Sequence, residues 1–466
     1  IYPKKNKIKY NDEKNSIVTN PTDIYNTVSI DPMGCKDIDD ALSFKLISNN
    51  KAEVSIHIAN VAQWVDRLNL TTNLYSTIYL NDGNQINMLD DDITYHKLSL
   101  GSNGIPKNAM SLFLVYDIVS SNSNSNKYNL IESYFREVSV KNTAISYSKS
   151  DDILAKAKAK AKAKAKLDNR CIYKPNSIEW MIVNLATLCG DGGDDGGGGD
   201  DGYIPSTKMV EHFMLLYNKI AAEKLYNVNK NTILRTHRLS EPSIITYNKL
   251  NQPICIPEDK LTKYLHILNQ NAAEYAKNPT NTYHESIGCK YYTHATSPIR
   301  RFIDVINQLN LQCIIGTELE STHKFIESTE DYLDKINIFN KNLRKFYNNY
   351  KKLSIVHTFN NTTSIADDDL LLENSQTLDA YIIAIKQCKL KLYIPSLDIE
   401  HNCQPISPKL LQSNHVVVVA PNKMIINDIT LNLHDKIKIK LTVLPYEEQF
   451  NKKLYITVLY PHITLL

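Results

Sequence analysis

Three features are missing from this sequence, and each absence excludes a class of protein. The eight cysteines are scattered without a C-x-x-C pair, which argues against a structural zinc site and a dense disulfide framework. A reduced intracellular compartment fits this usage best, and we expect the cytoplasm in preference to the nucleus. No apolar run approaches the length of about 18 residues that a membrane helix needs, so we expect no membrane span.

Net charge is also nearly absent. Lys and Arg total 53 against 50 Asp and Glu, which leaves a net charge of +3. Bulk charge therefore gives no argument for a nucleic-acid partner, and any such argument must come from local sites. Residues 1–10, IYPKKNKIKY, contain no apolar signal core. The length of 466 residues predicts about three domains, or one large domain and a small one.

Two low-complexity segments interrupt the N-terminal part of the chain. The first, AKAKAKAKAKAK at 155–166, would place lysine on all sides of a helix, so that no apolar stripe could dock. We interpret it as a solvated insertion, with a basic RNA-contacting arm as the alternative. The second, GDGGDDGGGGDDG at 190–202, is acidic and rich in glycine, which favours a mobile linker over a cation site.

The apolar pattern predicts an α+β chain with a β-rich C-terminus. A strand from Ser55 should lead into a helix, and residues 108–116 should form another strand, followed by a polar hairpin tip at 121–127. Helices are expected at 207–226, 258–276, 298–315 and 317–355, the last with Phe325, Tyr332, Ile336 and Phe339 at helical spacing. After a polar break at 361–369, five or so short strands in about 90 residues suggest a small OB-type barrel. We therefore expect a lead-in (1–20), a large domain (21–360), a linker (361–376) and the barrel (377–466).

The strongest candidate site is an acidic cluster embedded in apolar sequence. The segment SIDPMGCKDIDDALSF, residues 29–44, places Asp31, Asp37, Asp39 and Asp40 within ten residues. Carboxylates forced together repel each other, and even in water a pair at about 4 Å costs roughly 1 kcal/mol. A divalent cation offsets this repulsion, and ligands that are all oxygen suit Mg²⁺ or Mn²⁺.

The cluster has two other interpretations, a calcium-binding loop and an acidic surface turn without a function. An EF-hand loop that starts at Asp31 would need an oxygen ligand at its third position, glycine at its sixth and glutamate at its twelfth. Those positions hold Met33, Lys36 and Leu42, so we reject a calcium loop. A functionless acidic surface turn stays open for this segment alone.

The second candidate site is YYTHATSPIRRFIDVINQL, residues 291–309. Thr296 or Ser297 would cap a helix whose first residue is Pro298. Arg300 and Arg301 would then lie in the first turn, where the positive helix end disfavours cations. An anion such as a phosphate, bound between them and the free backbone N–H groups, would explain both arginines. The alternative is that they pair with nearby carboxylates.

Together the two segments resemble the ribonuclease II/R family, the RNB exoribonucleases, which include the catalytic subunit of the eukaryotic exosome. The family pattern DP-x-x-x-x-D-x-DDA-[LI], VHIAD, T-S-P-I-R-[RK]-[YF]-x-D is matched in order by DPMGCKDIDDAL, IHIAN and TSPIRRFID. Weaker matches are STIYLNDGNQINML (76–89), AISYSKSD (144–151), MVEHFMLLYN (209–218) and ILRTH (233–237). The resemblance covers about 20–355, and the last 90 residues or so are less strongly similar to the family's C-terminal OB-type RNA-binding barrel.

The resemblance implies a role for each matched residue. The four aspartates correspond to the family's metal ligands for Mg²⁺ or Mn²⁺, with Asp39 as a catalytic residue. Arg300 corresponds to the arginine that holds the scissile phosphate. Tyr147 corresponds to an aromatic that stacks near the 3′-terminal nucleotides, and Tyr79 to a tyrosine that grips RNA further back and sets the final product length. As isolated aromatics, both tyrosines would be ordinary core residues.

Some positions depart from the family. Where the family has V-E-E, this chain has Val210, Glu211 and His212. Glu211 is retained as a substrate-binding candidate, but His212 puts the selection of RNA over DNA in doubt if the second position reads the ribose. HIAD ends at Asn60 instead of aspartate, and VINQL follows Asp304 in place of the usual His-Arg.

The resemblance thus implies a mixed-sheet catalytic domain around an RNA channel, and a hydrolytic 3′→5′ exoribonuclease. Single-stranded RNA would be degraded to 5′-nucleoside monophosphates by a two-metal mechanism, with partners in an RNA-decay complex. The rival hypothesis is an RNA-binding protein on an RNB scaffold whose catalysis has weakened. A metal-dependent nuclease that prefers DNA is a third.

Overall fold

The computed structural model forms two compact units. The described part of the first unit extends through residue 339, and the described part of the second begins at residue 340. The structure describes residues 9–10, 23–69, 74–80, 83–101, 104–120, 126–163, 173–191, 204–237, 273–317, 332–362, 375–386, 389–403, 417–420, 423–426, 429–444, 447–449 and 453–460.

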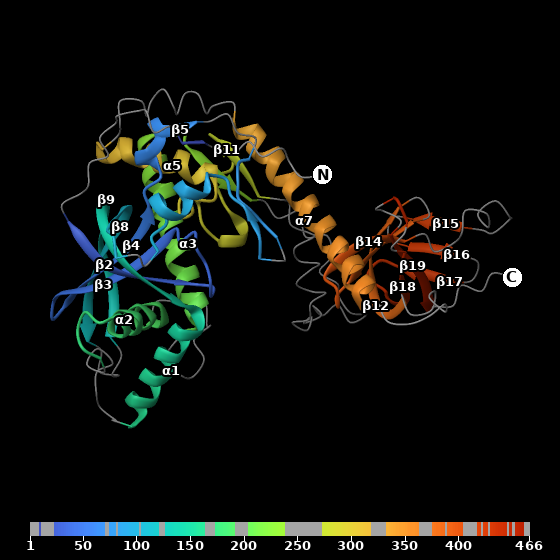
Figure 1. Cartoon of the computed structure of the whole chain (residues 1–466), viewed down its shortest axis with the longest axis horizontal. Coiled ribbons are helices and arrows are strands. Elements are labelled where there is room, and N and C mark those ends of the chain that lie inside the picture. Colours follow the sequence, from blue (N-terminus) through green and yellow to red (C-terminus); the bar gives the residue numbers. More distant parts are fainter. Residues whose placement is uncertain are drawn as a thin grey trace. The chain divides into compact units, whose positions relative to one another are not determined.

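A closed five-stranded barrel forms the centre of the first unit (Figure 1). Its strands, in hydrogen-bonded order, are β2 (Ile24–Asp31), β3 (Asp40–Ser48), β4 (Lys51–Ala59), β8 (Lys107–Ser120) and β9 (Asn126–Ser146). Neighbouring strands are antiparallel except where β9 closes the barrel parallel to β2. Every second residue of β4, from Val54 to Ile58, enters the core, as the apolar alternation predicts.

The strands expected from Ser55 and at 108–116 are confirmed as parts of β4 and β8. A 3₁₀ helix, Ala62–Arg67, follows β4 where a helix was expected. The strands β8 and β9 form the expected hairpin, whose tip at 121–125 lies outside the described residues.

Helices pack against this barrel through their apolar side chains. They are α1 (Tyr147–Ala163), α2 (Ile178–Asp191), α3 (Ser206–Val228) and α5 (Phe302–Ile315). On α2, Trp180 is almost fully buried and its ring lies edge-on to that of Phe44, with centroids 5.1 Å apart. The helix expected at 207–226 is confirmed as α3. None of the helices in the described part of the chain is long and apolar enough to cross a membrane.

Short elements complete the first unit. They are β1 (Lys9–Tyr10), β5 (Leu68–Asn69), β6 (Ile78–Tyr79), β7 (Gln85–Ile86), a π-helix (Ile93–Leu98), β10 (Ile233–Thr236), β11 (Glu274–Lys277) and a 3₁₀ helix (Glu285–Ile287). The helix expected at 258–276 is wrong at its C-terminal end, because Glu274–Lys277 pairs with β10 as a strand. The remainder of that prediction falls before residue 273 and lies outside the described residues.

The alanine–lysine repeat extends α1 to Ala163. The lysine side chains at 156 and 160 are exposed, in agreement with a solvated segment, but Ala157 is fully buried. The expectation that no part of the repeat could dock was therefore wrong, because alanine is small enough to continue the apolar face that Ile153 and Leu154 begin. Residues 164–166 of this repeat, and 192–202 of the glycine-rich segment, lie outside the described residues.

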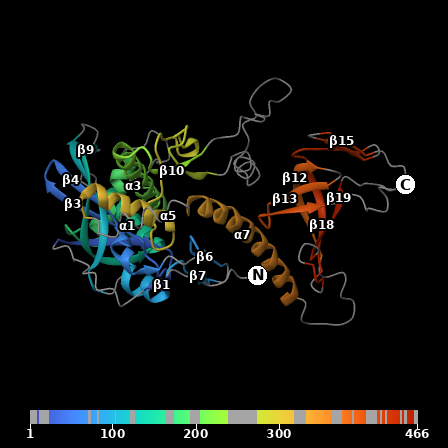
Figure 2. The same ribbon diagram turned by 90° about the horizontal axis from the view of Figure 1, so that it is seen from above.

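The long helix expected at 317–355 is α7, described from Tyr332 to Thr362, and Figure 2 shows it as one continuous helix. Ile336 is buried in the first unit's core, and Tyr332 and Phe339 pack against that core. Two corrections follow. Gly316, with φ of 70°, ends α5, so Thr317 is not helical, and α7 continues into the expected break at 361–369. Phe325 and residues 363–369 lie outside the described residues.

The second unit is built on a five-stranded antiparallel sheet in the order β14-β13-β12-β18-β19. Cys403 on β14 lies 3.5 Å from the carbonyl oxygen of Ile456 on β19, so the two edges of the sheet approach each other. A partly open five-stranded barrel is the OB architecture, as expected. A further three-stranded sheet, β15-β16-β17, was not expected. The strand bounds are β12 (Ser375–Lys386), β13 (Lys389–Ile394), β14 (Ile399–Cys403), β15 (Val417–Ala420), β16 (Lys423–Ile426), β17 (Ile429–Asn432), β18 (Lys436–Val443) and β19 (Leu454–Tyr460).

Candidate active site

The acidic cluster occupies the connection between two barrel strands. Asp31 is the last residue of β2 and Asp40 is the first of β3. Between them the chain turns at Gly34, whose φ of 84° is readily adopted by glycine. The loop is then fixed by Ser99, whose hydroxyl accepts the N–H of Ile38 at 3.0 Å and donates to the carbonyl of Lys36 at 2.7 Å. The four aspartates are thus held on a short, anchored loop at one end of the barrel.

Asp39 joins this loop to the arginine segment. Its side chain is 2% exposed, and its Oδ1 accepts the backbone N–H of Ile299 at 2.9 Å. Its Oδ2 accepts a hydrogen bond from Arg300 Nε at 3.0 Å. The two segments that carry the strongest sequence motifs therefore meet in space, although 261 positions separate Asp39 from Arg300.

The arginines lie just before the helix and not in its first turn. The helix α5 begins at Phe302 with Arg301 as its N-cap, so the expected start at Pro298 was wrong. The reason is that Asp304 folds back to accept the N–H of Ser297 at 2.8 Å and pairs with Arg301 at 2.8 Å. In this structure both arginines pair with carboxylates, as the alternative predicted, and the binding of an anion beside them stays a prediction.

Arg300 differs from Arg301 in its accessibility. The side chain of Arg300 is 41% exposed, and its Nη2 donates to Ser297 Oγ at 2.8 Å. The side chain of Arg301 is 24% exposed and its partner Asp304 is fully buried. Arg300 is therefore available to an incoming anion, whereas Arg301 fixes the start of α5.

Burial sets the electrostatics of the cluster. It raises the pKa of Asp31 to about 6 and that of Asp40 to about 8, and neighbouring carboxylates add to both shifts. It also raises the pKa of Asp39 to about 7, against the lowering effect of Arg300 and of the Ile299 N–H. Carboxyl groups with raised pKa values, gathered at one site, are typical of a place where a bound cation supplies the missing positive charge.

The ligand atoms that the cluster offers are of the chemical type that a divalent cation prefers. Asp31 Oδ2 is buried and has no hydrogen-bond partner, and all four side chains offer oxygen. In the described part of the chain, however, no three acidic, histidine or cysteine side chains are already arranged as a metal cage. Asp39 is engaged by Arg300, and Asp37 Oδ2 accepts the hydroxyl of Tyr79 at 2.6 Å.

Both candidate tyrosines lie at this cluster. Tyr79 ends the short strand β6 and its hydroxyl contacts Asp37. Tyr147 begins α1, and burial raises its pKa to about 12, with the charges of Asp40 and Asp31 adding to the shift. Both aromatics are thus close to the carboxylates: Tyr79 contacts Asp37, and Tyr147 lies near Asp40 and Asp31.

The structure does not bring Glu211 to the aspartates. Glu211 lies on the exposed face of α3, where it pairs with Lys208 at 2.7 Å, and no hydrogen bond or ion pair joins it to the cluster among the described residues. His212 is beside it, with its ring edge-on to that of Phe213. Burial, followed by the charge of Lys219, lowers the pKa of His212.

The departure at Asn60 has a structural explanation. Asn60 is 1% exposed and its amide donates to Glu137 Oε1 at 2.8 Å. Gln63 and Gln312 donate to the same carboxylate at 3.0 and 2.7 Å. An aspartate at position 60 would face Glu137, so asparagine suits this neighbour. Asparagine in place of the family's aspartate at position 60 contacts Glu137, and among the described residues its side chain makes no hydrogen bond with the four aspartates.

The residues after Asp304 are also structural. Asn307 donates to Thr293 Oγ1 and to the carbonyl of His294, at 2.8 and 2.9 Å. Gln308 accepts the N–H of Ala62 and donates to the carbonyl of Ala59, both at 2.9 Å. These amides fix α5 to the end of β4 and to the loop before α5.

Sequence reasoning missed three contributors to the site. Ser297 orients Arg300, Asp304 caps the segment before α5, and Ser99 clamps the acidic loop. Ser297 and Asp304 stand inside the TSPIRRFID motif, so the motif itself was the available signal. Ser99 stands in no recognised motif, and its contact with a loop some 60 residues away could not be read from the pattern.

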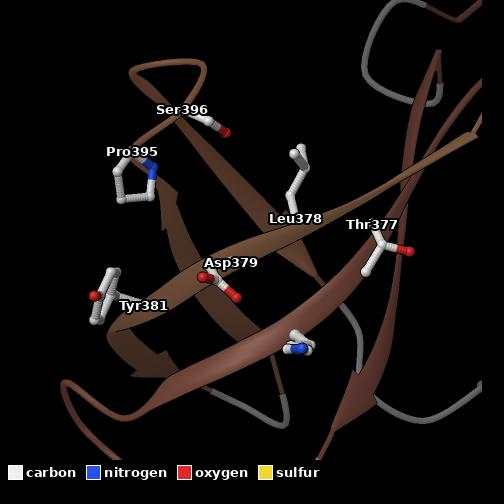
Figure 3. A pocket seen from close by; sticks show the side chains of 7 residues that line it. Thr377, Leu378, Asp379, Tyr381, Pro395 and Ser396 are labelled. Carbon is white, nitrogen blue, oxygen red and sulfur yellow. The ribbon is translucent and has the colours of Figure 1, made fainter.

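The second unit carries a separate pocket, with a volume of about 420 Å³ (Figure 3). Asp379 and Tyr381 on β12 line it together with Pro395, Ser396 and Lys438. Asp379 is paired with Lys436 at 2.9 Å. The pocket offers one carboxylate that already has a cationic partner, so it does not repeat the chemistry of the acidic cluster.

A barrel end with clustered carboxylates beside an arginine is the kind of site that acts on phosphate esters. The model of the RNB domain family matches residues 21–188 and 203–317, more than half of the chain. The chain therefore belongs to the RNB family. This confirms the family expected from the two motifs.

Individual relatives agree with this membership. The chain is 23% identical over 466 aligned residues to mouse "Exosome complex exonuclease RRP44", covering 89% of this chain and 46% of that protein. The chain thus spans about half the length of the mouse and human exosome exonucleases that it matches. In fold it resembles Mycoplasma genitalium RNase R solved with ribose-methylated single-stranded RNA, with a TM-score of 0.66, 17% identity, and coverage of 95% of this chain and 72% of that one. It also resembles yeast Ssd1, described as a pseudonuclease, with a TM-score of 0.61, 12% identity, and coverage of 98% and 68%.

Proposed function

We propose that this chain is a metal-dependent 3′→5′ exoribonuclease that hydrolyses single-stranded RNA to 5′-nucleoside monophosphates. The observation that carries the proposal is the contact between Asp39 and Arg300 at the end of the barrel. It brings the acidic loop and the phosphate-clamp candidate together, with Asp31, Asp37 and Asp40 on the same loop. RNB relatives named as exonucleases support the reaction class.

Asp31, Asp37, Asp39 and Asp40 are the residues that would hold Mg²⁺ or Mn²⁺. A pair of such cations, when bound, supplies an activated water and charge neutralisation for an in-line displacement. The aspartates themselves must be ionised to act as ligands, so the raised pKa values of Asp31, Asp39 and Asp40 make cation affinity depend on pH. This dependence is a test of the site that needs no RNA.

Arg300 acts on the substrate. Its Nε stays on Asp39 while the exposed part of the guanidinium contacts the scissile phosphate and neutralises charge that develops there. Tyr147 stacks on a nucleotide near the 3′ end, and Tyr79 holds the RNA further from the cut. Glu211 contacts the substrate from the exposed face of α3.

The second unit binds the RNA backbone. Three lysines of β18, at 436, 438 and 440, alternate with buried residues of that strand, and their register partners on β12 are Tyr381, Asp379 and Thr377. Asp379 pairs with Lys436, so three lysines and one carboxylate leave the face with net positive charge. A basic sheet face beside an aromatic ring suits single-stranded RNA. We further propose partners in an RNA-decay complex, by analogy with the exosome subunit, and an intracellular, cytoplasmic location.

The test is hydrolysis of a labelled single-stranded RNA, with its 3′ end free or blocked, in Mg²⁺ or in EDTA. We expect stepwise shortening to 5′-monophosphates only with a free end and Mg²⁺. Asp39→Asn keeps an acceptor for the Ile299 N–H, so RNA binding should persist while hydrolysis is abolished. Cleavage by this variant at more than a few per cent of the wild-type rate would refute the assignment of Asp39.

The competing hypothesis is an RNA-binding protein that does not hydrolyse RNA. It draws on the absence of a preformed metal cage among the described residues and on the fold of the Ssd1 pseudonuclease. Under this hypothesis the wild-type chain and Asp39→Asn would bind RNA equally and neither would shorten it in Mg²⁺. The same assay therefore separates the two functions.

A further inference from the structure

The hydroxyl of Tyr79 makes a contact that base stacking does not require. It lies 2.6 Å from Asp37 Oδ2. Within the described residues, the hydrogen-bond contact of the other oxygen of Asp37, Oδ1, is with the thiol of Cys35 at 3.7 Å, and a thiol is a weak donor. One oxygen of Asp37 is thus held by a strong donor, while the other stays available to a cation.

Both sides of this contact are anchored. On the side of Tyr79, the N–H of Thr77 and the hydroxyl of Ser76 both donate to the carbonyl of Arg300 at 3.0 Å. On the side of Asp37, Ser99 holds the flanking residues of the loop. The segment that carries Tyr79 is therefore fixed to the arginine turn and its hydroxyl reaches the acidic loop.

We propose that Tyr79 is a positioning residue for the metal site, and that its hydroxyl orients the Asp37 carboxylate toward the bound cation. The inference rests on the proposed metal-dependent function and deepens it. Carboxylates that ligate metals are commonly oriented by a hydrogen bond from a neighbouring group, and loss of such a partner typically costs 10- to 100-fold in metal affinity or activity. Burial, followed by the interactions with Asp37, raises the pKa of Tyr79, so the hydroxyl keeps its proton at neutral pH.

The test is Tyr79→Phe, which removes the hydroxyl and keeps the ring. Mn²⁺ affinity, measured by electron paramagnetic resonance without RNA, should fall by about 10- to 100-fold. RNA affinity in EDTA should stay within about twofold of the wild-type value, since the ring remains. The Mg²⁺ concentration for half-maximal hydrolysis should rise, and saturating Mg²⁺ should restore most of the rate.

Tyr95→Phe is the matched control. Its hydroxyl accepts the side-chain amides of Gln85 and Asn87, at 2.8 and 2.7 Å, on the segment that follows Tyr79. A general loss of local structure would lower Mn²⁺ affinity in both variants, whereas the proposal predicts a loss in Tyr79→Phe alone. A double-mutant cycle with Asp37→Asn should also show that Tyr79→Phe has no further effect once the carboxylate is gone.

The outcomes distinguish a failure of the proposed metal-dependent function from a failure of the positioning role of Tyr79. If wild-type protein binds no Mn²⁺, the proposed metal-dependent function fails and the role of Tyr79 fails with it. If wild type and Tyr79→Phe bind Mn²⁺ equally, the positioning role is refuted while the proposed function stands. Lower RNA affinity of Tyr79→Phe in EDTA with unchanged Mn²⁺ affinity would likewise refute it.

Discussion

Replacing Arg300 should separate its two roles, one in catalysis and one in holding Asp39. In Arg300→Ala the buried Asp39 keeps the N–H of Ile299 and loses the guanidinium at 3.0 Å. Loss of a hydrogen bond to a charged group should lower the free energy of unfolding by about 1.5–3 kcal/mol. Loss of a donor to the developing charge should cost about 2.7–4 kcal/mol in the transition state, which is roughly a hundred- to thousandfold in rate.

Arg300→Lys distinguishes geometry from charge. An ammonium group restores the positive charge, but it cannot reach Asp39 and a phosphate through a planar fork. We therefore expect part of the stability to return and most of the rate deficit to remain. Single-turnover decay of a 5′-labelled RNA of about 30 nucleotides at saturating Mg²⁺, with thermal unfolding of each variant, measures both quantities.

Arg301→Ala is the control for this experiment. Arg301 pairs with the fully buried Asp304, so its loss should destabilise the protein by about 3–5 kcal/mol, the range for a broken buried pair. It should leave the single-turnover rate of the folded protein unchanged. Wild-type turnover in Arg300→Lys, or an equal slowing in Arg301→Ala, would show that the phosphate-clamp reasoning is wrong.

Three further predictions concern pH, a departure from the family, and the end of digestion. Carboxyl groups whose folded pKa values are raised stabilise the protein at low pH. They lose that effect as pH rises from about 4, the pKa of an unfolded aspartate, to about 8, so in EDTA the melting temperature should fall over this range. The stabilisation by Mg²⁺ should grow with pH, and a shift that does not vary with pH would contradict this. Asn60→Asp, although it restores the family residue, should lower the free energy of unfolding by about 1–3 kcal/mol through loss of the hydrogen bond to Glu137, and Glu137→Gln should offset it in thermal melts. Tyr147→Ala should slow every cleavage step and blur the limit product on a sequencing gel, whereas Tyr79→Ala should release longer end products; identical ladders for wild type and Tyr79→Ala would exclude that role.

The local sequence pattern was sufficient to predict an element where the structure of that segment does not depend on distant residues. The apolar pattern of β4 and the helical periodicity of α3 predicted both elements, although both faces of β4 are buried from Val54 to Ala59. The start of α5 was mispredicted for a physical reason. Thr296, Ser297 and Pro298 form a good N-terminal signal, but Asp304 caps the chain at Ser297 and holds residues 298–300 in a turn. A tertiary hydrogen bond thus overrode a local preference.

The sequence allowed the residues of the site to be predicted, but not how they are arranged in space. The acidic loop and the arginine turn were each recognisable, but only the fold shows that Asp39 is the residue on which they meet. The role of Glu137 at Asn60 depends on β9 and α5 lying beside the end of β4, which no local pattern reveals. Long-range polar contacts of this kind have no periodicity and therefore leave no signal in a single sequence.

The contacts made by the aspartates also explain how a site for cations can be stable without them. Four clustered carboxylates would repel one another, yet Arg300 and the Ile299 N–H stabilise Asp39, and the Tyr79 hydroxyl stabilises Asp37. The pKa is raised most at Asp40, and Asp31 Oδ2 is buried with no hydrogen-bond partner among the described residues, so these two carboxylates are the least compensated. A cation should therefore be drawn first toward Asp31 and Asp40, where it replaces a bound proton instead of competing with an arginine. It follows that removing Asp40 should lower the affinity for Mn²⁺ most among the four aspartates, whereas removing Arg300 should leave that affinity intact and should lower the rate and the stability.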